Sequence, residues 1–301
     1  MGGGLAGPEL AAAVSEAGGL GTIGMLGRAP LADELASARR LTERPLAVNL
    51  LLPFARSGDW EAAGQADVVV TFWGTPRRRT SGVWIHQCGS VEEALAARAA
   101  GADAVIAQGV EAGGHVRGTT SASELLERFR VALGELPVLS AGGIAEADDV
   151  RARLDAGADA VVAGTRFLMS AESGAHPEYK RRLVGAHETV LTELFGAGWP
   201  APHRVIPNAA TSRWLGSDPL GPGWLRAANR ITAPVLSRVP PSVQARLAAR
   251  QRPGMPLLGP AAATEGRGDN LIEAGPLYAG ESVARIDDIR PAAGIVRDLV
   301  S

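Results

Sequence analysis

The chain has 301 residues, of which 46% are hydrophobic and 21% charged, and its formal net charge is −2. This length suits one α/β barrel or two modest domains, and the composition is that of an ordinary soluble globular protein. No basic run is longer than the three arginines at 77–79, which argues against a nucleic-acid partner. Cys88 is the only cysteine, so an intrachain disulfide framework is excluded and a reducing cytoplasm is expected.

Three further classes of protein are disfavoured by the sequence. No apolar run approaches the ~20 residues of a membrane span, and no secretory signal pattern opens the chain, so we expect a cytoplasmic protein without a membrane partner. Lys180 is the only lysine and lies in an Arg-rich helical stretch, which disfavours an aldolase that needs a lysine in its site. No group of side chains has metal-ligand spacing, so no metal site is expected.

Helix and strand patterns alternate through the first 170 residues. Short apolar runs bounded by turn residues predict strands over 20–24, 46–51, 67–72, 83–86, 104–107, 138–141 and 160–163. Helices are predicted over 8–17, 31–41, 91–100, 122–133 and 147–156. The linker between the strands at 67–72 and 83–86 is too short for a full crossover helix.

This alternation predicts an α/β fold, a TIM (β/α)₈ barrel. The sequence AGADAVIA at 100–107 recurs as AGADAVVA at 156–163, and each copy is a helix end, a glycine turn and a strand. Repeated βα units with parallel strands favour a barrel over an open sheet. Seven strands are predicted where a barrel needs eight, so the first strand is expected to be missing or rudimentary, or to precede the recorded start.

Three parts of the chain are distinguished by composition. We expect the TIM barrel over 1–176 and a C-terminal segment over 271–301 that returns to it and ends in a helix over 292–300. Between them, 177–270 is rich in Pro and Trp and contains helical stretches such as 243–250. This middle part is predicted to be a mostly helical insertion, or lid, after the last strand.

The chemically informative residues follow the predicted strands, where barrel active sites form. They are Asn49, Trp73-Gly74, Gln87, Gln108, Gly113-Gly114-His115, Ala141-Gly142-Gly143 and Gly164-Thr165. His115 has the only side chain in its loop that titrates near neutrality, so it is the candidate for moving a proton. A solvated histidine on a surface turn is the alternative.

Two glycine turns come after the seventh and eighth barrel strands, where phosphate-binding loops commonly lie. Backbone amides of glycine turns bind anions without lysine or arginine, which favours a phosphate-bearing cofactor. The alternative is that Gly142, Gly143 and Gly164 only make tight turns.

Several segments together resemble one family, the nitronate monooxygenases, once called 2-nitropropane dioxygenases. They are 8–14 (PELAAAV), 49–50 (NL), 86–88 (HQC), 108–115 (QGVEAGGH), 141–144 (AGGI), 163–167 (AGTRF), 198–205 (GWPAPHRV) and 278–280 (YAG). The resemblance covers nearly the whole chain in order. It implies an FMN-dependent TIM barrel that oxidises alkyl nitronates with dioxygen, releasing nitrite and a carbonyl compound.

The resemblance also implies roles for individual residues. His115 would be the catalytic base that takes the α-proton of a neutral nitroalkane. Amides at Gly142-Gly143 and Gly164-Thr165, beside Ala141, would bind the FMN phosphate. The flavin ring and ribityl chain would contact Met1, Asn49, Gln87, Gln108, Ala112, Gly113 and Gly114. Some relatives carry a lysine and an acid where this chain has Gln87 and Gln108, so the redox tuning of the flavin is expected to differ.

Two other functions remain open from the sequence. One is an FMN-dependent enoyl-[acyl-carrier-protein] reductase that uses NAD(P)H, and the other is a flavin-binding protein without turnover. The expected partners are a small nitronate and dioxygen, and the sequence is compatible with a homodimer.

Four side chains near these motifs have competing interpretations. His86 is interpreted as a satisfied core histidine. His203 is interpreted as a residue of the insertion that stays away from the site, with the site mouth as the alternative. Glu111 either orients the His115 loop or is solvated, and Trp73 either lines a substrate pocket or packs in the core.

Overall fold

The computed structural model describes residues 1–27, 29–239, 241–266 and 268–301. A parallel sheet of seven strands, in the order β1-β2-β3-β4-β5-β7-β8, is curled into a TIM-like barrel. Its strands are β1 (Gly21–Gly24), β2 (Leu46–Leu51), β3 (Val68–Phe72), β4 (Val83–Cys88), β5 (Ala104–Gln108), β7 (Val138–Ala141) and β8 (Ala160–Val162). These are the seven predicted strands, and their neighbours pair in parallel as predicted.

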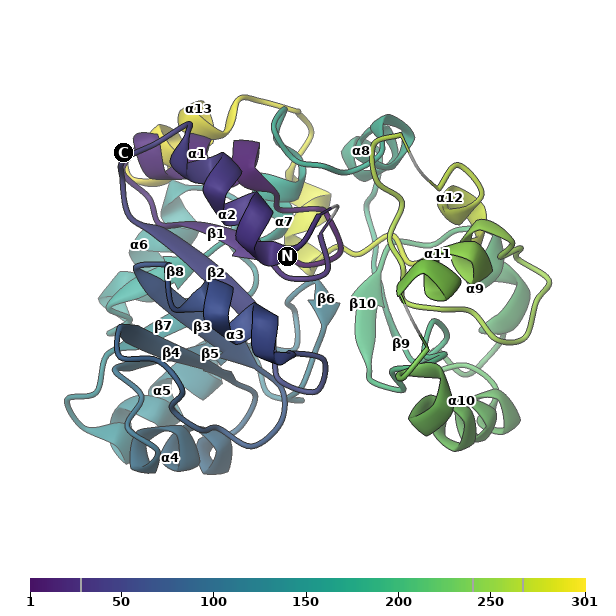
Figure 1. Cartoon of the computed structure of the whole chain (residues 1–301), viewed down its shortest axis with the longest axis horizontal. Helices are drawn as coiled ribbons and strands as arrows, with labels where there is room; N and C mark the ends of the chain where they lie inside the picture. Colours follow the sequence, from purple (N-terminus) through teal and green to yellow (C-terminus); the bar gives the residue numbers. More distant parts are fainter. Residues whose placement is uncertain (28, 240, 267) are drawn as a thin grey trace.

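Helices cover the outside of this sheet (Figure 1). They are α1 (Pro8–Glu16), α2 (Leu31–Arg39), α3 (Ser57–Ala63), α4 (Val91–Ala99), α5 (Ala122–Leu133), α6 (Ala147–Asp155), the short α7 (Thr165–Leu168) and α13 (Ala292–Leu299). The five helices predicted in the barrel and the closing helix are present, each ending within two residues of its prediction. As predicted, no helix of the described chain connects β3 to β4.

Side chains alternate along each strand between the barrel interior and the surrounding helices. Ala47, Val70, Ile85, Ile106 and Ala141 form one cluster, which is the barrel interior. The intervening residues pack against helices instead, and Trp84 of β4, for example, joins a cluster with residues of α4 and α5. Side chains two positions apart on a strand point to the same face. The residues of the interior cluster therefore tell which side chains at the carboxyl end of each strand point into the barrel.

Within the described residues, no strand precedes α1, and the start of the chain follows the open edge of β1. The amide of Gly3 donates to the carbonyl of Met25 over 3.0 Å, and the amide of Gly24 donates to the carbonyl of Ala6 over 3.1 Å. These residues occupy a short irregular segment beside β1. The segment therefore satisfies part of the sheet edge that a first barrel strand would otherwise pair with.

A second part of the molecule follows the last barrel strand (right side of Figure 1). Its helices are α8 (Pro177–Val184), α9 (Ala209–Trp214), α10 (Gly223–Leu236), α11 (Pro241–Ala249) and α12 (Leu271–Ala274), and it also contains two short strands, β9 (Val190–Thr192) and β10 (His203–Val205). They pair antiparallel with β6 (Gly114–His115) in the order β6-β10-β9. The insertion thus shares a small sheet with a loop of the barrel.

The C-terminal segment returns to the barrel through contacts with both parts. The amide of Ile206 donates to the carbonyl of Leu277 over 2.9 Å, and the amide of Gly280 donates to Thr165 Oγ1 over 2.9 Å. The 3₁₀ helix η1 (Glu281–Arg285) and α13 complete the chain. Across the described ranges, no helix combines the length and apolar character that crossing a membrane requires.

Candidate functional site

The polar residues at the strand ends face the barrel interior. Asn49 and Gln87 lie two positions beyond Ala47 and Ile85, which line the interior, and Gln108 lies two beyond Ile106. Gln87 pairs with Ile106 across the β4–β5 ladder, so Gln108 lies one layer nearer the rim than Gln87. The structure therefore brings three of the predicted amides to the inner rim.

Gln108 fixes the backbone of the loop that carries His115. Its Nε2 donates to the carbonyl of His115 over 2.9 Å, and its Oε1 accepts from the amide of Arg117 over 3.3 Å. The sequence suggested only a cofactor contact for this residue. Because both ends of the amide bind the loop, a hydrophobic residue at this position would leave a buried carbonyl and amide unpaired.

His115 lies in β6 and is surrounded by aromatic rings. The indole of Trp199 stacks on the imidazole with centroids 3.6 Å apart and an interplanar angle of 20°. The rings of His203, Tyr278 and Trp73 lie 5.3, 5.5 and 6.5 Å away. His115 Nε2 is fully buried and has no hydrogen-bond partner. A buried polar atom without a partner is costly, so this nitrogen points to a ligand that would pair with it.

His203 contacts His115 through the backbone and through the side-chain ring. The two residues are directly paired in the β6–β10 ladder. The Nδ1 of His203 lies 2.9 Å from the carbonyl of Ala201, and its Nε2 accepts from the amide of Phe195 over 3.3 Å. These two contacts fit one neutral tautomer with the proton on Nδ1. The interpretation that His203 stays away from the site was wrong, because strand pairing across the insertion was not visible in the sequence.

Burial determines the protonation of both rings. It lowers the pKa of His115 well below its usual 6.5, with a smaller contribution from His203. Burial also lowers the pKa of His203 to about 4, although its hydrogen bond to Ala201 acts in the opposite direction. At neutral pH both rings are therefore uncharged, and His115 is in the form that accepts a proton.

His86 lies on the other side of its strand, facing the helices. Its Nδ1 is 2.7 Å from Thr71 Oγ1, and this hydroxyl oxygen accepts a hydrogen bond from Trp84 Nε1 over 2.8 Å. The side chain is buried, which confirms the interpretation as a core histidine. Burial lowers the pKa of His86 to about 4, with an opposing effect from Glu93 and a small additional lowering from Arg117.

We expect the buried histidines to make the fold sensitive to acid. His86 and His203 have folded-state pKa values of about 4, below the 6.5 of an exposed histidine, so the unfolded chain binds more protons between these values. The free energy of unfolding should therefore fall as the pH drops from 6.5 towards 4. At pH 5 the loss should be about 2 kcal/mol for each ring, measured by urea denaturation at pH 7 and pH 5.

His86→Gln isolates this effect, because glutamine does not titrate. Between pH 7 and pH 5 the free energy of unfolding of the variant should fall by about 2 kcal/mol less than that of the wild type. An unchanged difference would show that His86 does not contribute to the acid sensitivity.

The predicted glycine turns lie beside one another at the same rim. Gly142 and Gly143 adopt φ of +118° and +79°, a region that favours glycine. A Cβ on Gly142 would lie 3.2 Å from Glu111 Cγ, and one on Gly113 would lie 2.4 Å from the amide nitrogen of Gly280. Since the amide of Gly280 also donates to Thr165 Oγ1, the 111–113, 142–143 and 164–165 turns meet around the C-terminal segment.

Glu111 orients these turns and is not simply solvated. Its two carboxylate oxygens accept from the amide of Ala122, at 3.0 and 3.1 Å, at the start of α5. Arg153 lies 3.4 Å from the same carboxylate and 3.5 Å from the carbonyl of Gly142. Arg285 donates to the carbonyl of Gly143 over 2.7 Å. The sequence did not identify these two arginines, because each reaches the turn from a separate helix.

The other predicted cofactor contacts are near this rim. Ala112 is buried between Glu111 and Gly113, and Gly114 has φ of +75° with nothing within 4 Å of an added Cβ. Met1 packs against the cluster that contains Leu168 and Ala279. Within the residues that the structure describes, no three His, Cys, Asp or Glu side chains are grouped to hold a metal ion.

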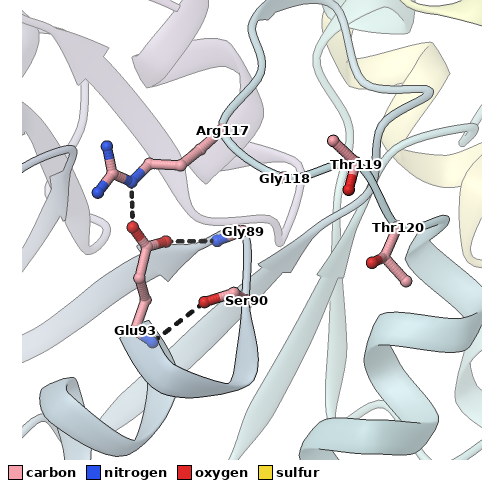
Figure 2. Close-up of a pocket in the computed structure, with 7 residues that line it drawn as sticks. All are labelled: Gly89, Ser90, Glu93, Arg117, Gly118, Thr119 and Thr120. Atoms are coloured by element: carbon pink, nitrogen blue, oxygen red, sulfur yellow. Dashed lines mark hydrogen bonds and ion pairs between the residues drawn. The ribbon is translucent and has the colours of Figure 1, made fainter.

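Trp73 lies between this site and an open pocket. It has φ of +65°, which is uncommon for a bulky residue, and its ring makes an edge contact with Trp199 at 5.3 Å. The guanidinium of Arg117 lies 4.8 Å from the Trp73 ring and is ion-paired with Glu93. Arg117 also lines a pocket of about 310 Å³. Figure 2 shows its lining residues, which are Gly89, Ser90, Glu93, Arg117, Gly118, Thr119 and Thr120.

The family model and a curated relative identify the chain with the nitronate monooxygenases. The family model for nitronate monooxygenase matches residues 1–79 and 75–301. A nitronate monooxygenase of Pseudomonas aeruginosa is 35% identical over 69% of this chain and 76% of its own length.

Solved structures are similar over almost the whole chain. FabK from Thermotoga maritima matches 99% of this chain and 90% of its own, with a TM-score of 0.76 and 30% identity. The nitroalkane oxidase of Streptomyces ansochromogenes matches 99% of this chain and 92% of its own, with a TM-score of 0.72 and 30% identity. The chain therefore belongs to the nitronate monooxygenase family of flavin-dependent oxidoreductases.

Proposed function

We propose that this protein is an FMN-dependent enzyme that oxidises alkyl nitronates with dioxygen, producing a carbonyl compound and nitrite. The observation that carries the proposal is the buried, unpartnered Nε2 of His115, held at a rim where three glycine turns meet. Because burial lowers the pKa of His115, this nitrogen is uncharged at neutral pH, and it is the atom that a bound substrate would contact. The names of the relatives and of the nitroalkane oxidase support the same chemistry.

The residues at the rim fit a flavin mononucleotide. Gly142 and Gly143, together with Gly164 and Thr165, would bind the phosphate through backbone amides. At Gly164 nothing in the protein lies within 4 Å of an added Cβ, so the turn has room for a phosphate beside it. The inward-facing amides at the strand ends would bind the polar edge of the ring and the ribityl chain. The remaining contacts in this proposal are Met1, Ala112, Gly113, Gly114 and Ala141. When bound, FMN supplies the redox chemistry that an amino-acid site lacks.

His115 would act as a base only for a neutral nitroalkane. Its Nε2 takes the proton from the α-carbon, and the electron pair of the broken C–H bond is delocalised onto the nitro oxygens. This role requires the tautomer with the proton on Nδ1. A preformed nitronate has already lost the proton and needs no base. Gln108 holds the His115 backbone in place during this step.

Anaerobic mixing tests the proposal. The purified protein should show bound flavin, and propionate 3-nitronate alone should bleach its visible absorbance. Bleaching by NADH, with oxidation by an enoyl thioester and no reaction with the nitronate, would instead identify the enoyl reductase named above. A protein that binds flavin and reacts with neither would be the non-catalytic binder.

Gly164→Ala tests the phosphate site separately from the fold. Gly164 has φ of −107°, which alanine adopts freely, and nothing in the protein lies within 4 Å of the added methyl group. We expect the free energy of unfolding of the flavin-free protein to be unchanged. The Kd for FMN should rise about tenfold or more, because the methyl group disturbs a hydrogen bond to a charged phosphate. Fluorescence titration of the flavin-free protein with FMN measures this constant.

Gly185→Ala is the matched control. Gly185 also has an ordinary φ, −95°, and open space around an added Cβ, but it follows α8 in the insertion. Its Kd for FMN should equal that of the wild type. Equal affinity in both variants would place the phosphate elsewhere.

A further inference from the structure

Trp199 and His115 form a pair of stacked rings in which two polar atoms lack partners. The rings are 3.6 Å apart, and both Trp199 Nε1 and His115 Nε2 are buried without a hydrogen-bond partner. The indole nitrogen is a donor only, while the neutral imidazole offers a lone pair. One small ligand with an acceptor and an acidic C–H group would satisfy both atoms at once.

The indole of Trp199 is held in this position by its surroundings. The preceding Gly198 has φ of +87°, and the amide of Trp199 donates to the carbonyl of Gly196 over 3.0 Å. Phe54 and Trp73 pack edge-on against the indole at 5.2 and 5.3 Å. The ring is therefore preorganised rather than free to rotate towards solvent.

The other polar groups around His115 are already engaged. His203 uses both ring nitrogens, and the hydroxyl of Tyr278 donates to the carbonyl of Pro260 over 2.8 Å. Arg117 is ion-paired with Glu93. Among the described rings that contact His115, the buried donor without a partner belongs to Trp199.

We propose that the indole N–H of Trp199 donates a hydrogen bond to an oxygen of the substrate's nitro or nitronate group, while His115 Nε2 faces its α-carbon. This assignment rests on the proposed function. The α-carbon and the oxygens are two bonds apart in the substrate, which suits two polar atoms on rings in direct contact. Trp199 is then the group that recognises the planar NO₂ end of the substrate.

The two substrate forms should depend on this hydrogen bond differently. A nitronate carries its negative charge on the oxygens when it binds, so the bond contributes to binding. A neutral nitroalkane acquires that charge only as the proton moves to His115 Nε2 and the C–H electron pair spreads onto the oxygens. The bond then strengthens in the transition state and contributes to kcat.

Trp199→Phe removes the donor and keeps an aromatic ring against His115. For propionate 3-nitronate we expect KM to rise about 10- to 100-fold with little change in kcat. For nitroethane we expect kcat to fall by a similar factor while KM changes little. The Kd of nitrate, a planar anion measured by the change in flavin absorbance, should rise about tenfold or more. Flavin content and melting temperature should match those of the wild type.

Trp224→Phe is the matched control, because this indole is 58% exposed on α10. It should leave both KM values and the Kd of nitrate unchanged. A Trp199→Phe protein with wild-type KM for the nitronate and wild-type Kd for nitrate overturns the proposal. Loss of flavin with an unchanged nitronate KM in the remaining holoenzyme also overturns it, because the indole would then serve the cofactor.

Two further readouts keep the inference separate from the proposed function. If the wild type fails to oxidise any nitronate, the function is wrong, and the nitrate titration still decides whether Trp199 binds a planar anion. If Trp199→Phe does not fold, the wild-type holoenzyme provides the test by nuclear magnetic resonance. Nitrate should move one indole N–H resonance downfield, and no movement overturns the assignment.

Discussion

Replacing His115 with asparagine should abolish the oxidation of neutral nitroalkanes and leave nitronate oxidation nearly intact. A positioned general base contributes about 10²- to 10⁴-fold, so kcat for nitroethane should fall by that factor. Asparagine offers no comparable base. The strand pairing with His203 and the hydrogen bond from Gln108 both use the backbone at position 115, so the loop should keep its shape. Steady-state kinetics with nitroethane and with its preformed nitronate measure the difference.

The pH profile of the wild type provides the control. Because burial lowers the pKa of His115 well below 6.5, kcat/KM for nitroethane should be level between about pH 6 and 8, without the rise expected from an exposed histidine. Any fall should appear only at more acidic pH, where the imidazole becomes protonated. An equal fall in kcat for both substrates in His115→Asn would mean that the histidine does not act mainly as a base.

Gly113→Ala should disrupt the contact between the His115 loop and the C-terminal segment. The added methyl group would lie 2.4 Å from the amide nitrogen of Gly280 and 2.6 Å from the carbonyl carbon of Ala279. Both are backbone atoms, so no side-chain rotation relieves the overlap. We expect a loss of about 4 kcal/mol or more in the free energy of unfolding, together with loss of bound flavin. Urea denaturation and flavin absorbance of the purified variant measure the two effects.

Gly58→Ala is the comparison for this variant. Gly58 lies in the first turn of α3 with nothing within 4 Å of an added Cβ, and alanine favours a helix more than glycine does. This change should leave stability unchanged or raise it slightly. Wild-type stability in Gly113→Ala would contradict the close packing of residues 113 and 280.

The barrel was predictable because its strands are short apolar runs between turn residues. The repeat AGADAV marked two of them, and the short β3–β4 linker correctly indicated a missing helix. The small sheet β6-β10-β9 was not predictable. Its strands have two or three residues, too few to show alternation, and they pair only after the insertion has docked on the barrel.

The candidate site was predictable where single strands determine it. Each of the three amides, Asn49, Gln87 and Gln108, lies near the carboxyl end of its own strand, two positions beyond an inward-facing residue. Their place at the rim therefore followed from the sequence pattern. Trp199 and Arg285 were missed because they reach the site from separate parts of the chain. His203 was assigned incorrectly for the same reason, since its proximity to His115 comes from pairing across the insertion.

The pairing of β6 with β10 has a consequence for how enzymes of this shape diversify. The strand β6, which carries His115, lies in a loop between the barrel strand β5 and the helix α5, yet the strand it pairs with, β10, belongs to the inserted segment. Replacing the inserted segment would therefore change the strand against which the backbone of His115 is held. Under the proposed function, substitutions of side chains on β9 and β10 would alter the surroundings of His115 and keep the strand pairing, whereas replacing the whole segment would remove that pairing.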